Sequence, residues 1–425
     1  MSIKKEYDVV VIGSGPGGLA AALAAKKNKA RDVLIIERDL ELGGILLQCI
    51  HNGFGVEVLK KDLPGPSYAQ IFIDQVLEKG VETMLDSMVL DITPDLKIFT
   101  AGKRSGFNEI KAKAIVLAMG CRERTRSQIR LPGFRPAGVY TAGTAQRWVN
   151  VEGFMPGKQF VILGSGDIGM IMARRLTFEG AKVERVLEVM PYLTGLNRNY
   201  VQCLLDFDIP LQLRHTVKRI IGKERVEAIE SVQVDEKWQP ITGTEEVIPC
   251  DTLLLSVGLI PENELSRKAG VALDPITGGP YVDDTFMTNV PGIFAAGNVV
   301  HVYDLVDWVT EAGLAAGRSA ARYARKGKLL SKRKTRIRAG ENVRYVVPHT
   351  IDPGNLKEDD ISLQFRVREP LEENVYLALH NGKKMIMRKA AQYVRPGEMA
   401  TLVLRKKHHE DINNAEELTV SVIRR

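Results

Sequence analysis

The chain is poor in cysteine and lacks long apolar runs. It holds four cysteines in 425 residues, too few and too scattered for a disulfide framework, so a reducing compartment fits better. No apolar run approaches the roughly 18 residues that a membrane helix requires. The N-terminus lacks the apolar segment and small-residue cleavage site of a secretory signal. We therefore expect a cytoplasmic protein with no integral membrane segment.

Positive charge is in excess in only one segment. The formal net charge is +7, and residues 325–338 hold eight Lys or Arg and no acid, which leaves −1 (7 − 8) for the rest. Such runs are typical of solvated linkers. Docking to an acidic partner or a peripheral membrane contact is the alternative. Aromatic residues do not interleave with the segment, so nucleic-acid binding is not expected.

A glycine-rich turn follows the first apolar run. Residues 7–12 (YDVVVI) read as a buried parallel strand, and an Ala-rich helix comes after the turn. Gly13 permits the tight turn, Gly15 lets the backbone approach a pyrophosphate, and Gly18 lets the helix pack close to the strand. The helix N-terminus favours phosphate. Glu37 ends the next strand, 19 residues after Gly18, where it can bind ribose hydroxyls. This order predicts a dinucleotide-binding unit.

A second unit repeats this design. Residues 158–163 (KQFVIL) read as a strand, and Gly164, Gly166 and Gly169 form the same turn. Glu188 again lies 19 residues after the third glycine. A carboxylate at this position binds a ribose 2′-hydroxyl and repels a 2′-phosphate. We therefore predict two bound dinucleotides, with NADH preferred over NADPH at the second unit.

Three further segments complete a recognisable pattern. They are KAIVLAMG at 113–120, DTLLLSVG at 251–258 and TNVPGIFAAGNVV at 288–300. With the two turns, they resemble the two-dinucleotide-binding-domain flavoproteins, the pyridine nucleotide-disulfide oxidoreductase superfamily, over about residues 5–325. The resemblance implies an α/β fold with two Rossmann-like domains, the NAD domain inserted in the FAD domain. It also implies FAD at the first turn and NADH at the second, with NADPH weaker.

The resemblance also assigns site residues. Asn298 stands where the family has an Asp that contacts the FAD ribityl and pyrophosphate groups. The helix at 307–323 would point its N-terminus at the flavin, with Val309 and Thr310 in contact. The implied FAD residues are Gly13, Gly15, Pro16, Gly18, Glu37, Arg38, Gly44, Gly120, Gly297, Asn298, Val309 and Thr310. The implied NAD residues are Gly164, Gly166, Asp167, Gly169, Glu188 and Gly258.

The C-terminal region departs from the family's reductases. Residues 340–425 give short alternating strands separated by turn signals, including the Asn381-Gly382 hairpin signal. We expect a small all-β, sandwich-like domain. The predicted organisation is FAD-binding domain at 1–125 and 251–325, NAD-binding domain at 126–250, basic linker at 326–339 and β domain at 340–425.

Cysteine pairs that carry dithiol chemistry are missing. The family's disulfide reductases have C-x-x-x-x-C after the second strand, but here Cys49 stands alone and Phe54 takes the later position. The cysteine spacing gives no metal site. Cys49 could cycle through sulfenic acid if its thiolate is accessible and of low pKa, or it could fill the flavin wall as a small apolar residue.

Local matches narrow the resemblance. The stretches 42–55, 118–126 and 135–146 look like FAD/NAD-binding subunits of heteromeric dehydrogenases and oxidases. Relatives of this kind include the NADH-oxidising subunit of proline dehydrogenases, subunits of opine dehydrogenase and hydrogen cyanide synthase, and chains that accompany glycerol-3-phosphate dehydrogenase-like flavoproteins. This implies a partner subunit with its own FAD and a small-molecule electron acceptor. The leading hypothesis is an FAD-dependent NADH oxidoreductase that passes electrons to that partner, a dye or oxygen. The alternatives are an NADH peroxidase using Cys49 and a non-catalytic, cofactor-loaded structural subunit.

Overall fold

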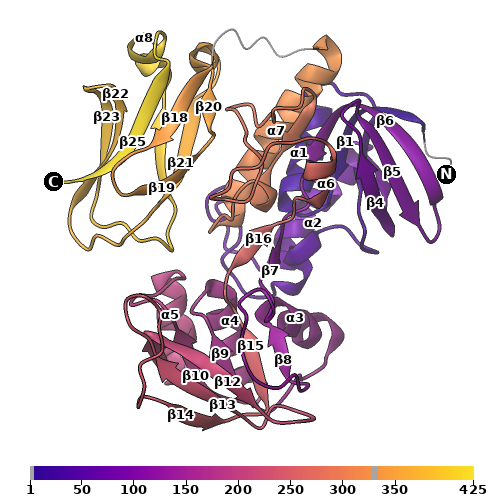
Figure 1. Cartoon of the computed structure of the whole chain (residues 1–425). Coiled ribbons are helices and arrows are strands. Elements are labelled where there is room, and N and C mark those ends of the chain that lie inside the picture. Colours follow the sequence, from indigo (N-terminus) through magenta and orange to yellow (C-terminus); the bar gives the residue numbers. More distant parts are fainter. Residues whose placement is uncertain (1–3, 328–333) are drawn as a thin grey trace. The chain divides into compact units, whose positions relative to one another are not determined.

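The computed structural model describes residues 4–327 and 334–425, which form two compact units (Figure 1). The first unit comprises Met1–Cys121 and Pro261–Arg425, and the second comprises Arg122–Ile260. The chain enters and leaves the second unit through β7 (Cys121–Glu123) and β16 (Leu259–Pro261), which pair with each other. No helix in the described ranges is both long and apolar enough to cross a membrane.

A seven-stranded sheet forms the centre of the first unit. Its order is β3-β2-β1-β6-β5-β4, and β17 also pairs with β6. The strands β1, β2, β3, β6 and β17 run parallel, whereas β4 and β5 join antiparallel. The apolar central strands are buried, as parallel strands covered on both faces must be. The bounds are β1 (Glu6–Ile12), β2 (Val33–Ile36), β3 (Glu82–Met84), β4 (Ser87–Ile92), β5 (Lys97–Gly102), β6 (Gly106–Leu117) and β17 (Ile293–Ala295).

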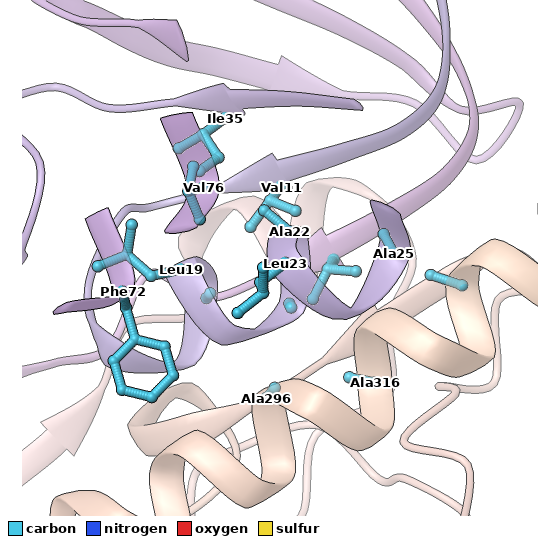
Figure 2. Close-up of a cluster of buried hydrophobic side chains, with 14 of the residues drawn as sticks. Val11, Leu19, Ala22, Leu23, Ala25, Ile35, Phe72, Val76, Ala296 and Ala316 are labelled. Atoms are coloured by element: carbon cyan, nitrogen blue, oxygen red, sulfur yellow. The ribbon is translucent and has the colours of Figure 1, made fainter. Parts of the chain in front are cut away.

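Helix α1 packs unusually close to helix α7, and both cover one face of this sheet (Figures 1 and 2). A Cβ added to Gly313 would lie 2.3 Å from Gly17 O, and one added to Gly317 would lie 2.0 Å from Ala21 O. Only glycine allows this approach, and it buries the Ala-rich helix on several sides. Figure 2 shows Leu19 in the buried cluster, beside Phe72 and Val76 of α2. Outside the C-terminal β region, the helices of this unit are α1 (Pro16–Lys27), α2 (Gly65–Glu78), α6 (Glu264–Lys268) and α7 (Val306–Lys326).

The second unit repeats the parallel design on a smaller scale. Its five-stranded sheet has the order β11-β10-β9-β15-β8, and a three-stranded antiparallel sheet β12-β13-β14 accompanies it. The strands are β8 (Val139–Thr141), β9 (Gln159–Leu163), β10 (Lys182–Glu188), β11 (Leu211–Leu213), β12 (His215–Ile221), β13 (Ala228–Gln233), β14 (Glu246–Pro249) and β15 (Thr252–Leu255). The helices are α3 (Ala142–Arg147), α4 (Asp167–Phe178) and α5 (Asn197–Cys203).

The predicted boundary at 250/251 is wrong. Strand β15 pairs with β9 and β8 in the sheet of the second unit, so that unit continues to Ile260. The apolar run predicted the strand but not its neighbours, because sheet membership depends on long-range pairing. The earlier boundary at 125/126 likewise moves to 121/122.

The C-terminal region forms two packed sheets, as the alternating strands predicted. A five-stranded sheet has the order β20-β18-β25-β22-β23, and a three-stranded sheet has the order β19-β21-β24. Side chains from both line one core. The elements are β18 (Thr335–Ala339), β19 (Val343–Val347), β20 (Thr350–Ile351), β21 (Ile361–Val367), β22 (Val375–Asn381), β23 (Lys384–Ala391), β24 (Ala400–Leu404), α8 (His409–Ile412) and β25 (Glu417–Arg424).

Part of the predicted basic linker is regular structure. Residues 335–339 form β18, which pairs in parallel with β25 and begins with the buried Thr335. The predicted linker also overlaps Lys326, the last residue of α7. Residues 328–333, the middle of the basic run, lie outside the described residues. Alternation of Arg and Ile at 336–338 was the strand signal that the charge obscured.

Candidate functional site

The first glycine turn has the backbone that its sequence requires. Gly13 has φ +97°, and a Cβ there would lie 2.5 Å from Ala118 O. A Cβ on Gly18 would lie 2.0 Å from Gly13 O, so α1 reaches the turn only because both positions are glycine. The turn therefore brings the N-terminus of α1 directly against the ends of the parallel strands.

Gly15 lies at the open point of this turn. A Cβ added there would meet nothing within 4 Å, so its backbone is open to a ligand. Gly44 packs from the next loop, with its Cβ position 2.9 Å from Gly15 Cα. The first bond within α1 runs from Leu19 N–H to Gly15 O, which leaves the preceding N–H groups without a helical partner. This glycine-walled cradle fits the pyrophosphate of a dinucleotide.

Glu37 closes the first turn through its carboxylate. The Ser14 N–H and Oγ–H both donate to Glu37 Oε2, at 2.8 and 2.6 Å. The Asp39 N–H donates to Oε1 at 3.0 Å. The carboxylate is buried, and Oε1 carries fewer protein donors than Oε2. Oε1 is thus the oxygen better suited to a ribose hydroxyl. Arg38, the next residue, is exposed.

The second glycine turn copies this framework at a constant offset of 151 residues (165 − 14 = 188 − 37). Gly164 has φ +100°. The Ser165 N–H and Oγ–H donate to Glu188 Oε2 at 2.8 and 2.7 Å, and the Met190 N–H donates to Oε1 at 2.9 Å. A Cβ on Gly169 would lie 2.7 Å from Ser256 Cβ. Both predicted acids therefore have the same local partners.

A loop covers the second turn more fully. Asp167 Oδ1 accepts hydrogen bonds from Leu196 N–H (2.9 Å) and Asn199 Nδ2 (2.6 Å). A Cβ on Gly195 would lie 2.8 Å from Ser165 O. Gly166, which is the counterpart of Gly15, has Ser256 Oγ 3.0 Å from its Cβ position. The second turn therefore has less open space at its middle glycine than the first.

Two glycines follow strands that end beside these turns. Gly120 comes after β6 with φ +72° and open space at its Cβ position. Gly258 comes after β15 with φ +100°, and only the side chain of Arg124 approaches its Cβ position, at 3.9 Å. Each glycine leaves backbone accessible at the carboxyl end of its sheet, where ligands of parallel α/β folds bind.

Asn298 is held by two neighbours in the first unit. Its Nδ2 lies 3.5 Å from Cys121 Sγ, and its Oδ1 accepts a bond from Tyr303 N–H at 3.1 Å. Gly297 precedes it with φ +78°. The Asn298 amide therefore helps to hold the loop between β17 and α7. Asn298 is also the residue predicted to contact the FAD ribityl group.

The side chains at the start of α7 pack against neighbouring elements of the first unit. Thr310 is fully buried, and its Oγ1 lies 2.7 Å from Tyr68 Oη, so its hydroxyl is committed to α2. Val309 Cγ1 lies 3.0 Å from the Cβ position of Gly297. Asp307 Oδ1 accepts a bond from Val58 N–H at 2.7 Å. Its carboxylate offsets part of the positive end of the helix dipole, a feature that the sequence prediction did not include.

Cys49 lacks the environment of a reactive thiolate. Its side chain is buried, its Sγ donates to Ile45 O at 3.3 Å, and burial raises its pKa to about 12. His51 Nδ1 lies 2.9 Å from Asn52 O. All four cysteines lie in the described part of the chain, and none forms a disulfide. These features favour the role of a small apolar residue.

The sequence prediction missed several residues that stabilise one or the other of the two sites. They are Ser14, Ser165, Thr194, Asp307 and the close-packing Gly313 and Gly317. The two serines had a signal, because each is the second residue of an otherwise equivalent glycine turn. The others depend on contacts between distant segments. In the described residues, no cluster of three metal-ligating side chains is present.

Comparisons with known proteins find a family model and several relatives that match this chain. A family model described as Pyridine nucleotide-disulphide oxidoreductase matches residues 7–313. The A subunit of opine oxidase from Agrobacterium tumefaciens (strain Ach5) is 27% identical over 315 residues, which cover 69% of this chain and 61% of that protein. Thioredoxin reductase of Listeria innocua serovar 6a is 26% identical over 328 residues, which cover 76% of this chain and 95% of that one.

A solved structure shares the fold. The thioredoxin reductase of T. acidophilum superposes with a TM-score of 0.63 at 23% identity, covering 76% of this chain and all of that one. The chain spans only about three fifths of the length of the opine oxidase relative.

Proposed function

Because this chain belongs to the pyridine nucleotide-disulphide oxidoreductase family, we propose that it oxidises NADH and transfers the electrons through FAD to a partner subunit. The coarser activity follows from the family and its relatives: the chain is an FAD-dependent NAD(P)H oxidoreductase. The observation that carries the proposal is the pair of glycine turns, each with its serine-held glutamate. FAD, when bound, supplies the hydride acceptor.

The proposal divides the two turns between the two nucleotides. At the first turn, Gly15 and the start of α1 receive the FAD pyrophosphate, and Glu37 Oε1 accepts a ribose hydroxyl bond. Asn298 and the backbone at Val309 face the flavin. At the second turn, Gly166 and α4 receive the NADH pyrophosphate, and Glu188 Oε1 accepts its ribose bond. The assignment of FAD to the first turn and NADH to the second is supported by the family arrangement, in which the first unit binds FAD.

The charge at the second turn supports NADH as the reductant. The Glu188 carboxylate is buried and takes three donors on Oε2, including Thr194 Oγ1 at 2.9 Å. A 2′-phosphate would meet this fixed negative charge. The nearby Arg185 cannot compensate in its present position, because its guanidinium donates to Glu246 at 2.7 Å.

The acceptor after FAD is proposed to be a second subunit in the cytoplasm, itself carrying FAD. The relative from Agrobacterium tumefaciens is by its name one subunit of an oxidase, which supports this assembly. A disulfide acceptor, which the name of the Listeria innocua relative suggests, has less support. The four cysteines are at 49, 121, 203 and 250, so no close pair exists for a dithiol relay.

The two alternatives have weaker support. A peroxidase that uses Cys49 needs an accessible thiolate, whereas the thiol is buried and its pKa is raised to about 12. A structural subunit without catalysis would have no need for both complete glycine turns and both held acids. Oxygen or a dye remains an acceptor in the absence of the partner.

Steady-state reduction of a dye tests the proposal. We expect NADH to support turnover with a lower KM than NADPH, and Cys49→Ser to leave this activity unchanged. Turnover with NADPH alone would contradict the nucleotide assignment. Peroxide-dependent NADH oxidation that disappears in Cys49→Ser, with dye reduction retained, would favour the peroxidase.

A further inference from the structure

A buried arginine of the C-terminal β domain grips the loop that follows Asn298. Arg366, on β21, donates from Nη2 to Val302 O at 3.1 Å and pairs with the Asp304 carboxylate. Its Nη1 donates to Pro396 O at 3.1 Å. The other Asp304 oxygen accepts a bond from Met399 N–H at 2.5 Å. Two separate segments of the β domain thus hold the same aspartate.

This ion pair is shielded from water. The side chains of Arg366 and Asp304 are 15% and 7% exposed. Burial lowers the pKa of Arg366, but the charges of and hydrogen bonds to Asp304 and Tyr345 together more than offset this effect, so the pKa is raised. A buried ion pair is stabilised when further hydrogen bonds satisfy both groups. Removing one partner lowers the stability of the fold strongly, because it leaves the other charge buried and unpaired. The contact therefore fixes one loop geometry more firmly than a surface pair would.

The gripped segment connects two parts of the proposed flavin site. Asn298 Oδ1 accepts a bond from Tyr303 N–H, next to Asp304. Helix α7 begins at Val306, two residues after Asp304, and Val309 packs on Gly17 and Gly297. A shift at Asp304 would move the Asn298 amide at one end and the first turn of α7 at the other.

The C-terminal β domain is attached to the rest of the first unit at several other points. Asp352 N–H and Asn355 Nδ2 donate to the two oxygens of Asp284, at 3.0 and 2.8 Å. His349 N–H donates to Val282 O at 2.9 Å. Side chains of β19 also enter the core beneath the seven-stranded sheet. The domain is therefore attached at several points besides Arg366.

We propose that Arg366 is a positioning residue for the flavin, through which the C-terminal β domain sets the segment from Asn298 to Val309 in its FAD-binding geometry. This inference rests on the proposed function, which assigns Asn298 and the start of α7 to FAD. It gives the β domain a direct part in tuning the cofactor site.

The test compares three full-length variants. Arg366→Lys keeps the charge but cannot reach Val302 O, Pro396 O and Asp304 together, and Asp304→Asn removes the charge from the other side. Arg395→Lys is the matched control, because Arg395 is a half-buried arginine of the same domain that pairs with Glu372 rather than with Asp304. Each apoprotein is titrated with FAD, and the absorption spectrum and reduction potential of the bound flavin are recorded below the melting temperature.

We expect FAD binding about tenfold weaker in Arg366→Lys and Asp304→Asn, together with a changed flavin band and potential. Arg395→Lys should match the wild type. Lower melting temperatures with unchanged affinity, spectrum and potential would overturn the proposal and leave a purely structural pair, and so would failure of both variants to fold. A wild type that binds no FAD would instead refute the proposed function itself.

Discussion

The two glycine turns share the same serine–glutamate hydrogen bonds and differ in the residues that cover them. In each, a serine donates twice to a buried glutamate, and the residue two positions after the glutamate donates to its other oxygen. The first turn is then walled by Gly44, and its Gly15 stays open. The second carries Thr194 and Asp167 in place of Gly43 and Pro16, and these side chains tie a loop over the turn. The two turns therefore differ in their covering residues rather than in their glycines.

The largest expected difference between the units comes from the third glycine. Gly18→Ala places Cβ 2.0 Å from a backbone oxygen, whereas Gly169→Ala meets mainly the Ser256 side chain. We expect Gly18→Ala to lower the free energy of unfolding by about 3 kcal/mol, and Gly169→Ala by about 1 kcal/mol. Urea unfolding measures both. Equal losses would show that the two turns are packed alike.

Substitutions of Glu37 and Glu188 should affect the binding of FAD and of NADH separately. Replacing either by Gln turns an acceptor into a donor facing backbone N–H groups, at a cost of about 1–3 kcal/mol. Glu37→Gln should therefore weaken FAD binding. Glu188→Gln should retain FAD, raise the KM for NADH about tenfold and narrow the preference over NADPH. Glu246→Gln, an exposed partner of Arg185, is the control. The assignment of the second turn fails if Glu188→Gln releases FAD.

A buried histidine makes part of the stability of the first unit depend on pH. Burial lowers the pKa of His301 in the first unit to about 3, so the folded state stays neutral while the unfolded state gains a proton below about 6.5. Stability is therefore lost as pH falls, by up to about 1.4 kcal/mol per pH unit. Burial raises the pKa of Glu123 in the second unit, and this shift has the opposite effect. Its contribution to stability is lost as pH rises rather than as pH falls.

A His301→Phe variant isolates this effect, because Asp284 of the first unit, with a pKa raised to about 7 by burial, opposes it in the wild type. We expect the stability difference between wild type and variant to change steadily from pH 6.5 to 5 in urea unfolding. A difference independent of pH would contradict a buried neutral imidazole.

The smallest effect concerns Thr194. Thr194→Val removes the hydroxyl bond to Glu188 and should cost about 1 kcal/mol, which would weaken NADH binding severalfold without changing FAD content. Calorimetric titration with NADH or a non-reducing analogue measures this. An unchanged affinity would mean that the hydrogen bonds from Ser165 and Met190 suffice to hold Glu188.

Local patterns predicted the frame of both units, and long-range contacts decided the rest. Strand, glycine turn, helix and terminal acid lie within one short stretch, so their positions follow from the residues themselves. The sheet that β15 joins, and the burial of Cys49, depend on segments far away in the chain. Strand β18 was not predicted, because Arg336 and Arg338 give it the charge of a linker. The Arg366–Asp304 pair had no local signal at all.

An anaerobic titration of the flavin absorbance with NADH, and then with NADPH, tests the central claim most directly. We expect NADH to bleach the flavin band of the wild type at low concentration and NADPH to do so only at higher concentration. A chain that binds FAD but keeps its band unchanged after NADH addition would contradict hydride transfer from NADH to FAD.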